Sequence, residues 1–379
     1  MSKTPLQVGL SIGQGTGAEL AEVFEKVIHE ISRLYAMPVE VRRSLRKYHT
    51  YFSLLAENDP KVIQNETLED VRHYEKFCEE EFTNGTHVIF RTAINAQSLY
   101  IVRQDLEAVK VECFSQGQNS LLLIRDEAQG FYTGSNRHES AQGTIYRTCK
   151  FSRELTGRIV SYSLGRARKL WGENAIDSVL MVYKFHLFDG ALSLWAQEWS
   201  EKYGIKVQFV QPDTANRNLL AFGIQKRQLM IAGNEWADIM HSILLDKFQK
   251  GPQEARCTEN IYLHSRVHGL VEYQTVHGSA DDIAGKGVVN PMATIRAAAA
   301  ILERHGGCNG AERIVDYTLE ILHRRRIVTP DQGGSMSTKK VVDSFLDIIP
   351  STASLSGELD FPCATDRLAI KQASQAGKL

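Results

Sequence analysis

The chain has 379 residues, of which 43% are hydrophobic, and its formal net charge is −1. That length is enough for two domains. The near-neutral charge argues against nucleic-acid or membrane-surface binding, and no apolar run reaches membrane-spanning length. The N-terminus lacks the apolar segment of a signal peptide. Six scattered cysteines without CxxC spacing favour a reduced, cytoplasmic compartment and argue against a zinc site.

The chain opens with a pattern typical of a strand, a glycine turn and an amphipathic helix. Residues 7–12 are apolar, GQGTG follows at residues 13–17, and apolar residues then recur at helical spacing as far as Ile31. Charged and aromatic residues are frequent after that. The elements expected there are a strand at residues 39–41, helices at 48–55 and 68–81, a turn at 84–85 and a buried strand at 87–94.

The middle of the chain alternates strands and helices, and its last third is mostly helical. Such alternation predicts an α/β fold. From Pro350 the composition shifts to Ser, Ala, Gln, Gly and Lys, which indicates a C-terminal tail over residues 350–379. Strands are expected at residues 120–124, 178–182, 206–210 and 228–231, and helices at 153–170, 190–202, 291–304, 311–324 and 338–348.

One stretch, VHGSADDIAGKGVVNP at residues 276–291, combines a histidine, two aspartates and three glycines directly before a helix. Asn290 is expected to cap that helix and Pro291 to be its first residue. Backbone amides of a glycine-rich loop come close to a ligand, and a helix N-terminus favours a phosphate. An aspartate there accepts hydrogen bonds from an adenine ribose and repels a 2′-phosphate. The stretch therefore predicts a nucleotide-binding loop.

This stretch resembles the nucleotide-binding loop of the isocitrate/3-isopropylmalate dehydrogenase family, whose pattern reads HGSAPDIAGKG..NP. Only Asp281 replaces the usual proline. GQGTG resembles the family's opening GDGIG, and TPDQGG, at residues 329–334, resembles its TPDLGG. The resemblance implies that the cofactor is NAD, which Asp282 would select over NADP. The cofactor-binding residues that it implies are His277, Gly278, Ser279, Ala280, Asp282, Ile283 and Asn290.

The same resemblance implies two domains that share one long mixed β-sheet flanked by helices. Residues 1–106 and 258–349 would form the large nucleotide-binding domain, and residues 107–257 the small substrate and dimerisation domain. In the family, two subunits complete each other's active sites. The resemblance therefore implies a homodimer whose sites are shared across subunits.

Oxidation and decarboxylation of a 2-hydroxy acid set several chemical tasks. Carboxylates need a guanidinium clamp, the hydroxyl needs a base, and the enolate needs a divalent cation and a proton donor. The segments LYIVRQDL and IRDEAQGFYTG resemble the family patterns LRxxLDL and RENTEGxYSG. The resemblance implies Leu99, Arg103 and Arg125 for substrate binding, Tyr132 and Lys184 for catalysis, and Asp213 and Asp238 for Mg²⁺ or Mn²⁺.

Several positions depart from the family pattern. The second clamp arginine falls on Cys113, the last aspartate of the metal motif on Ser242, and the asparagine two residues after the catalytic lysine on His186. Gln97 and Leu99 replace the serine and asparagine that typify isocitrate enzymes. Two functions stay open. The chain is an NAD-dependent decarboxylating dehydrogenase of an atypical malate-type 2-hydroxy acid, or a catalytically impaired relative that acts as a regulatory or scaffolding subunit.

Overall fold

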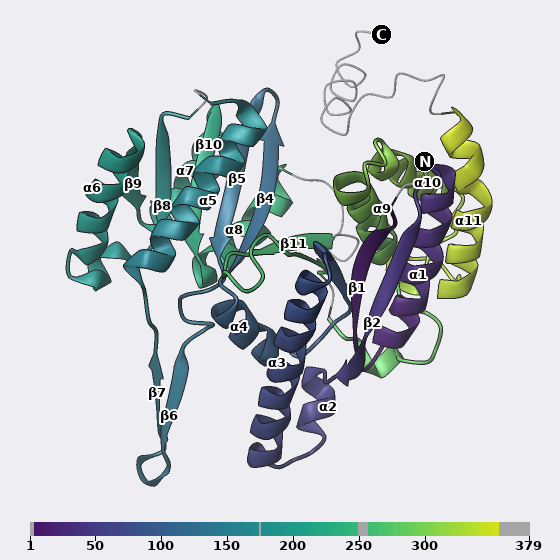
Figure 1. Cartoon of the computed structure of the whole chain (residues 1–379), viewed down its shortest axis with the longest axis horizontal. Helices are drawn as coiled ribbons and strands as arrows, with labels where there is room; N and C mark the ends of the chain where they lie inside the picture. The colour runs from purple at the N-terminus through teal and green to yellow at the C-terminus, as the bar shows by residue number, and fades with distance from the viewer. Residues whose placement is uncertain (1–3, 174–175, 249–256, 277, 356–379) are drawn as a thin grey trace. The chain divides into compact units, whose positions relative to one another are not determined.

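The structure is a computed structural model that describes residues 4–173, 176–248, 257–276 and 278–355 (Figure 1). Strands and helices alternate along most of it. The strands are β1 (Leu6–Gly13), β2 (Val39–Tyr48), β3 (Val88–Arg91), β4 (Ala108–Gln116), β5 (Asn119–Asp126), β6 (Ser135–Glu139), β7 (Thr144–Thr148), β8 (Ser178–Val182), β9 (Lys206–Val210), β10 (Arg227–Gly233), β11 (Cys257–Tyr262) and β12 (Val271–Thr275). The helices are α1 (Gly17–Leu34), α2 (Tyr51–Leu55), α3 (Pro60–Thr83), α4 (Ala96–Asp105), α5 (Arg153–Trp171), α6 (Ala191–Tyr203), α7 (Pro212–Phe222), α8 (Asn234–Phe248), α9 (Met292–Gly306), α10 (Ala311–Arg324) and α11 (Thr338–Leu355).

In the part of the chain that the structure describes, ten strands form one mixed sheet in the order β2-β1-β3-β12-β11-β4-β5-β10-β8-β9, and β6 and β7 form a second, two-stranded sheet. β1 pairs in parallel with β2 and β3, and β10 pairs in parallel with β5 and β8, whereas β4 runs antiparallel to β5. The predicted α/β fold with a long mixed sheet is confirmed. The chain divides into two compact units along this order. In the described part, unit 1 holds residues 4–99, 257–259, 269–276 and 278–355, and unit 2 the remainder.

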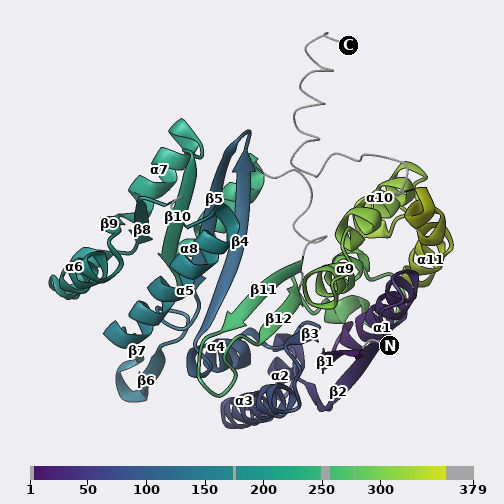
Figure 2. The same cartoon turned by 45° about the horizontal axis from the view of Figure 1, so that its top comes forward.

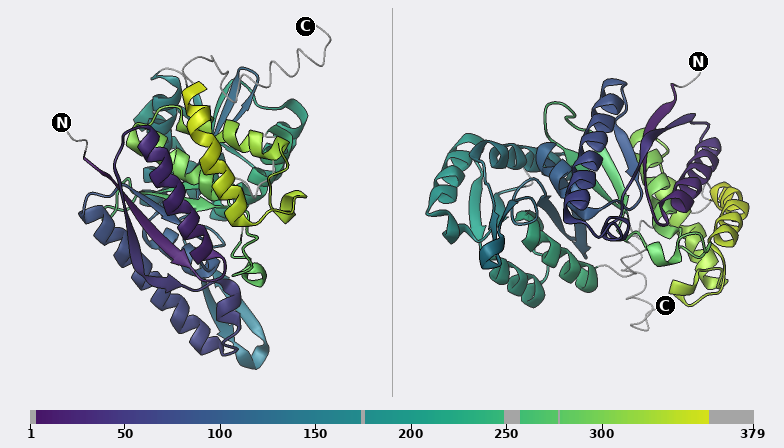
Figure 3. Two further views of the ribbon diagram at one scale, coloured as in Figure 1. Left: turned by 90° about the vertical axis from the view of Figure 1, so that its right-hand side faces the viewer. Right: turned by 90° about the horizontal axis from the view of Figure 1, so that it is seen from below.

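In unit 1, the helices α1, α9, α10 and α11 share a core with the strands β1, β3 and β12 (Figure 2). The apolar residues of α1 recur on one face, and Phe24 from that face stacks on Phe90 of β3 with 4.2 Å between ring centroids. The alanine run of α9, residues 297–300, is buried. α1 and α11 lie side by side (Figure 3), and Lys26 Nζ donates to Asp343 Oδ1 at 2.9 Å between them.

In unit 2, the core between the sheet and the helices α7 and α8 is made by alternate residues of the strands. Leu121 and Leu123 of β5 point to this core, where Met240 and Leu244 of α8 meet them. The strands β6 and β7 form an antiparallel hairpin that leaves the rest of the unit (Figure 1). The sequence analysis did not predict this hairpin.

Several element boundaries differ from the predicted ones, each for a local reason. β2 continues to Tyr48 because it is the edge strand of the sheet, where charged residues can alternate toward solvent. α2 therefore begins only after Thr50, which caps it. α3 begins at Pro60 rather than at residue 68, since Asp59 caps it and proline suits the first position of a helix.

α11 also differs from its predicted end, because it runs past Pro350, where the tail was expected to begin, to Leu355. Proline lacks an N–H and usually ends a helix. Here Ile349 and Thr352 are buried on either side of Pro350, so packing holds the last turns in helical form. The remaining tail, residues 356–379, lies outside the described residues.

Candidate functional site

The two glycine-containing segments of unit 1 that the sequence analysis selected, residues 13–17 and 276–291, lie against each other. The backbone N–H and the hydroxyl of Thr16 donate to the carbonyl oxygen of Ser279, at 3.2 and 2.9 Å. Gly15 has φ +64°, and a Cβ built there would lie 2.8 Å from that carbonyl oxygen. Glycine is thus required at this turn for the close approach of the loop.

Asp281, the residue that replaces the family's proline, is held by neutral hydroxyl donors. Thr50 Oγ1 donates to Asp281 Oδ1 at 2.7 Å, and Ser279 Oγ donates to Asp281 Oδ2. Thr50 is also the N-cap of α2, where its Oγ1 accepts from Ser53 N at 3.1 Å. The departure from the family pattern therefore ties the loop to the corner between β2 and α2.

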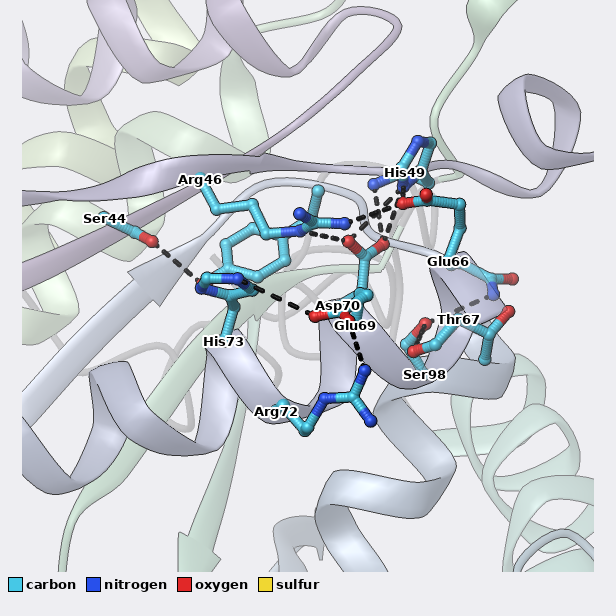
Figure 4. Close-up of polar contacts among 12 residues, drawn as sticks. Ser44, Arg46, His49, Glu66, Thr67, Glu69, Asp70, Arg72, His73 and Ser98 are labelled. Carbon is cyan, nitrogen blue, oxygen red and sulfur yellow. Dashed lines mark hydrogen bonds and ion pairs between the residues drawn. The ribbon is translucent and has the colours of Figure 1, made fainter. Parts of the chain in front are cut away.

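That corner is built around the buried carboxylate of Asp70 on α3 (Figure 4). Arg46 Nε donates to Asp70 Oδ1 at 2.7 Å, and the backbone N–H of His49 donates to Asp70 Oδ2 at 2.9 Å. Glu66 adds an ion pair to Arg46 at 3.0 Å. Thr50 follows His49 directly, so this network fixes the residue that holds the loop. The segment from residue 44 to 83 has little family resemblance in sequence, yet it supports the loop.

The predicted cofactor-binding residues lie along the rim and the base of this loop. Asn290 is buried at the base, where its Oδ1 accepts from Met292 N at 3.0 Å and its Nδ2 donates to Asp331 Oδ2 at 2.8 Å. The predicted cap is one residue off: α9 begins at Met292 and its N-cap is Pro291, so Asn290 lies one residue before the cap, from where it accepts the N–H of Met292. Gly278 and Asp282 are exposed, Ser279, Ala280 and Ile283 are half-buried, and His277 lies outside the described residues.

In unit 2, three buried cations surround one buried carboxylate. Glu127 lies directly after β5 and is fully buried. Its carboxylate oxygens lie 3.2 Å from Arg103 Nε, 3.6 Å from Arg125 Nε and 3.7 Å from Lys110 Nζ. Lys110 on β4 is the antiparallel partner of Arg125 on β5, so both side chains leave the same face of the sheet. Burial lowers the pKa of Lys110, and the charge of Glu127 opposes that shift. We call these four residues the cation cluster.

Tyr132 and Asp238 lie at the exposed rim of the cation cluster. Arg125 Nη1 donates to Asp238 Oδ1 at 2.5 Å, and Tyr132 Oη donates to Asp238 Oδ2 at 3.4 Å. The ring of Tyr132 stacks on Tyr100, with 5.2 Å between centroids. Burial, followed by the charge of Asp238, raises the pKa of Tyr132, so its phenol keeps its proton at neutral pH.

Lys184 and Asp213 form a separate pair in unit 2. Lys184 Nζ donates to Asp213 Oδ1 at 3.2 Å and lies 5.9 Å from the centroid of the Trp236 ring. The hydrogen bond from Lys184 lowers the pKa of Asp213. Gln211 Nε2 donates to His186 Nδ1 at 2.7 Å. The structure thus brings together Arg103, Arg125, Tyr132 and Asp238, and pairs Lys184 with Asp213 instead.

The residues of one chain do not fit a divalent cation. Asp238 is engaged by Arg125, Asp213 is engaged by Lys184, and Ser242 Oγ donates to the backbone oxygen of Asp238 at 3.4 Å. In the described part of the chain, no group of three or more His, Cys, Asp or Glu side chains could hold a metal. Mg²⁺ and Mn²⁺ need several oxygen ligands that are free to face them.

Cys113 and Leu99 do not extend the cation cluster. Cys113 is exposed and lies an odd number of residues from Lys110 along β4, so its side chain leaves the other face of the strand. Leu99 is buried on α4. Lys110 and Glu127 were not predicted from the sequence, although the pairing of β4 with β5 places Lys110 beside Arg125. Tyr100 and Thr50 carried no signal beyond their residue type.

The chain is similar to known proteins of one enzyme family. Residues 260–345 match the family model described as isocitrate/isopropylmalate dehydrogenase. The 3-isopropylmalate dehydrogenase of Oceanobacillus iheyensis is 29% identical over 272 residues, which are 66% of each chain, and the homoisocitrate dehydrogenase of Methanocaldococcus jannaschii is 27% identical over 60% of this chain and 62% of its own. The matched region thus spans less than two thirds of these relatives.

The fold is similar to that of a solved enzyme. The crystal structure of isocitrate dehydrogenase from Methylococcus capsulatus superposes with a TM-score of 0.62 at 19% identity, covering 90% of this chain and 99% of that one. At that identity the likeness concerns the fold alone. Among the helices that the structure describes, none is long and apolar enough to cross a membrane.

Proposed function

We propose that this divergent member of the isocitrate/isopropylmalate dehydrogenase family is an NAD-dependent decarboxylating dehydrogenase of an atypical malate-type 2-hydroxy acid. The observation that carries the proposal is the contact of Arg125, Tyr132 and Asp238 at the rim of the cation cluster. It places a fixed guanidinium next to a protonated phenol. Those are the groups needed to hold a carboxylate and to deliver a proton.

NAD would be held by the loop that includes Ser279, Asp282 and Ile283, and by the start of α9 near Asn290. When bound, it accepts the hydride from the hydroxyl-bearing carbon. The loop fits the adenosine part, because its glycine-assisted approach to Thr16 fixes the backbone while the carboxylate of Asp282 stays exposed. An exposed aspartate at that place favours a ribose with a free 2′-hydroxyl over a 2′-phosphate.

The residues of unit 2 would do the proton chemistry. Arg103 and Arg125 bind carboxylate, since their guanidinium groups stay charged when buried. Lys184, whose amine Asp213 orients, assists deprotonation of the hydroxyl, and Tyr132 protonates the enolate after carbon dioxide leaves. The raised pKa of Tyr132 keeps the phenol protonated until that step.

We derive no step through a metal, since the donors of one chain do not fit it. A cation between Asp238 and the Asp213 of a second copy would need Arg125 to release Asp238. The proposed homodimer is supported by the β6–β7 hairpin, which carries exposed Ile145 and Tyr146. An isolated two-stranded hairpin is marginally stable in water, so a second copy would stabilise it. The cytoplasmic proposal is supported by free thiols at Cys78, Cys149 and Cys257.

The test is NADH formation on a panel of malate-type acids, with and without Mn²⁺. Lys184→Met and Tyr132→Phe are expected to lower kcat on any acid that the wild-type chain oxidises by at least about a hundredfold. Lys206→Met, at an exposed position at the start of β9, is the matched control and should leave kcat unchanged. Equal activity in Lys184→Met and Lys206→Met would overturn the role given to Lys184.

A regulatory or scaffolding subunit is the second candidate function. It is favoured by the engagement of Asp238 by Arg125 and by Ser242 at the position of the family's last metal aspartate. It predicts that NAD binds while the whole panel gives no NADH in the presence of Mn²⁺. Turnover that is lost in Lys184→Met decides against it.

A further inference from the structure

Glu127 is a carboxylate where the corresponding family pattern has a neutral side chain. In the pattern RENTEGxYSG the residue two positions after the arginine is asparagine, and two positions after Arg125 stands Glu127. The sequence alone shows only a charge change in a loop. The structure shows that this charge is fully buried between the two arginines assigned to substrate.

The geometry shows that Glu127 uses the cations that a ligand carboxylate would use. Its oxygens face the Nε atoms of Arg103 and Arg125, at 3.2 and 3.6 Å, and Lys110 Nζ closes the third side at 3.7 Å. Arg125 directs its Nη1 outward to Asp238 at the rim. A ligand that enters from the rim therefore meets two guanidinium groups whose Nε atoms already face the carboxylate of Glu127.

We propose that Glu127 determines which acids the site accepts. Its carboxylate takes the place of one ligand carboxylate inside the cation cluster, so the site binds dicarboxylates of the malate type and excludes tricarboxylates of the isocitrate type. A third ligand carboxylate would be driven against Glu127 in a poorly solvated place, where like charges repel strongly. This inference rests on the proposed function, since it assumes that the cation cluster binds the substrate.

Lys110 has a matching role in this proposal. A buried lysine beside two arginines would raise the positive charge of the pocket, and Glu127 lies close enough to offset it. Removal of Lys110 and Glu127 together removes one charge of each sign. That pair of changes therefore releases the arginines without leaving an extra buried charge.

The experiment measures binding of malate and of isocitrate to the full chain without NAD, by isothermal titration calorimetry. The wild type is expected to prefer malate. In Glu127→Gln, isocitrate binding should become about tenfold or more stronger relative to malate binding, because the guanidinium groups of Arg103 and Arg125 no longer face the Glu127 carboxylate. Glu127→Asp keeps the charge and should keep the preference for malate.

A ratio of malate to isocitrate affinity that is the same in the wild type and in Glu127→Gln would overturn the inference, as would binding of neither acid by both proteins. Tryptophan fluorescence shows whether Glu127→Gln folds. If it does not fold, the ratio of malate to isocitrate affinity is measured in the double variant Lys110→Met/Glu127→Gln, where the same change in the ratio is expected. NADH formation is a separate readout. If NADH forms but the ratio of malate to isocitrate affinity does not change in Glu127→Gln, only the role of Glu127 is contradicted. If that ratio changes but no NADH forms on any acid, the proposed dehydrogenase activity is contradicted and the role of Glu127 in binding stands.

Discussion

The nucleotide loop of unit 1 and the cation cluster of unit 2 both carry an acidic residue that the family pattern lacks, and they accommodate it differently. Asp281 is held at the loop by the hydroxyl groups of Thr50 and Ser279, which leaves Asp282 exposed. Glu127 is buried among Arg103, Lys110 and Arg125. The carboxylate of Asp281 thus leaves the proposed cofactor-binding surface of the loop unchanged. The carboxylate of Glu127, by contrast, lowers the positive charge that the cation cluster presents to a ligand.

The largest effect is expected from breaking the cation cluster itself. Arg125→Met removes a buried guanidinium that contacts Glu127, Asn234 and Asp238. Because the buried carboxylate then loses a partner, the free energy of unfolding of unit 2 should fall by about 3–5 kcal/mol. Urea unfolding followed by tryptophan fluorescence measures this, since all four tryptophans lie in unit 2.

The matched control for that change is Arg153→Met. The ion pair of Arg153 with Glu198 is solvent-exposed on both sides, so the loss should be no more than about 1 kcal/mol. Equal losses in the two variants would show that the buried cation cluster stabilises unit 2 no more than an exposed ion pair does, and would contradict this prediction.

A second buried carboxylate at the end of β5 sharpens the comparison, because it is held by neutral groups. Asp126 accepts from Tyr183 Oη at 3.1 Å and from Gln129 Nε2 at 2.9 Å. Burial raises its pKa from 3.8 to about 6. A raised pKa means that the folded protein binds this proton more tightly than the unfolded chain, so stability falls as pH rises through that window.

The shift corresponds to about 3 kcal/mol between pH 4 and pH 7. In Asp126→Asn this titration is absent, so the variant should gain about that amount of unfolding free energy relative to the wild type as pH rises from 4 to 7. Urea unfolding at several pH values measures the difference. Parallel pH profiles for the two proteins would contradict the assignment.

A smaller effect is expected at the loop. Thr50→Val removes the donor to Asp281 and the cap of α2, which should cost about 2 kcal/mol of stability in unit 1 and weaken NAD binding. Thermal unfolding by circular dichroism, with and without NAD, measures both. Thr144→Val, at the start of β7 in the β6–β7 hairpin, should change stability by no more than about 0.5 kcal/mol. If Thr50→Val and Thr144→Val change thermal stability and NAD binding equally, the role of Thr50 in holding the loop is contradicted.

The sequence predicted most of what depends on local pattern. The periodicity of α1 and the glycine turn at Gly15 follow from neighbouring residues, and the structure has both. It did not predict contacts between distant segments. Asp281 with Thr50 joins residues 231 positions apart, and Lys110 beside Arg125 depends on strand register.

The contacts of the site that could not be predicted from the sequence are therefore those that depend on how strands pair and how distant segments meet. Arg103 and Arg125 were selected by resemblance, but their shared contact with Glu127 appears only when β4 and β5 are placed side by side. The pairing of Lys184 with Asp213 is likewise tertiary. Roles for these residues stay predictions until the variants are measured.

The most direct test of the central claim, that the loop of unit 1 keeps a surface for the adenosine of NAD, is ligand-dependent stability. NAD at about 100 times its dissociation constant should add about 2.7 kcal/mol to the free energy of unfolding, and NADP at the same concentration should add less, because the exposed Asp282 repels its 2′-phosphate. A larger stabilisation by NADP, or none by either nucleotide, would contradict the account.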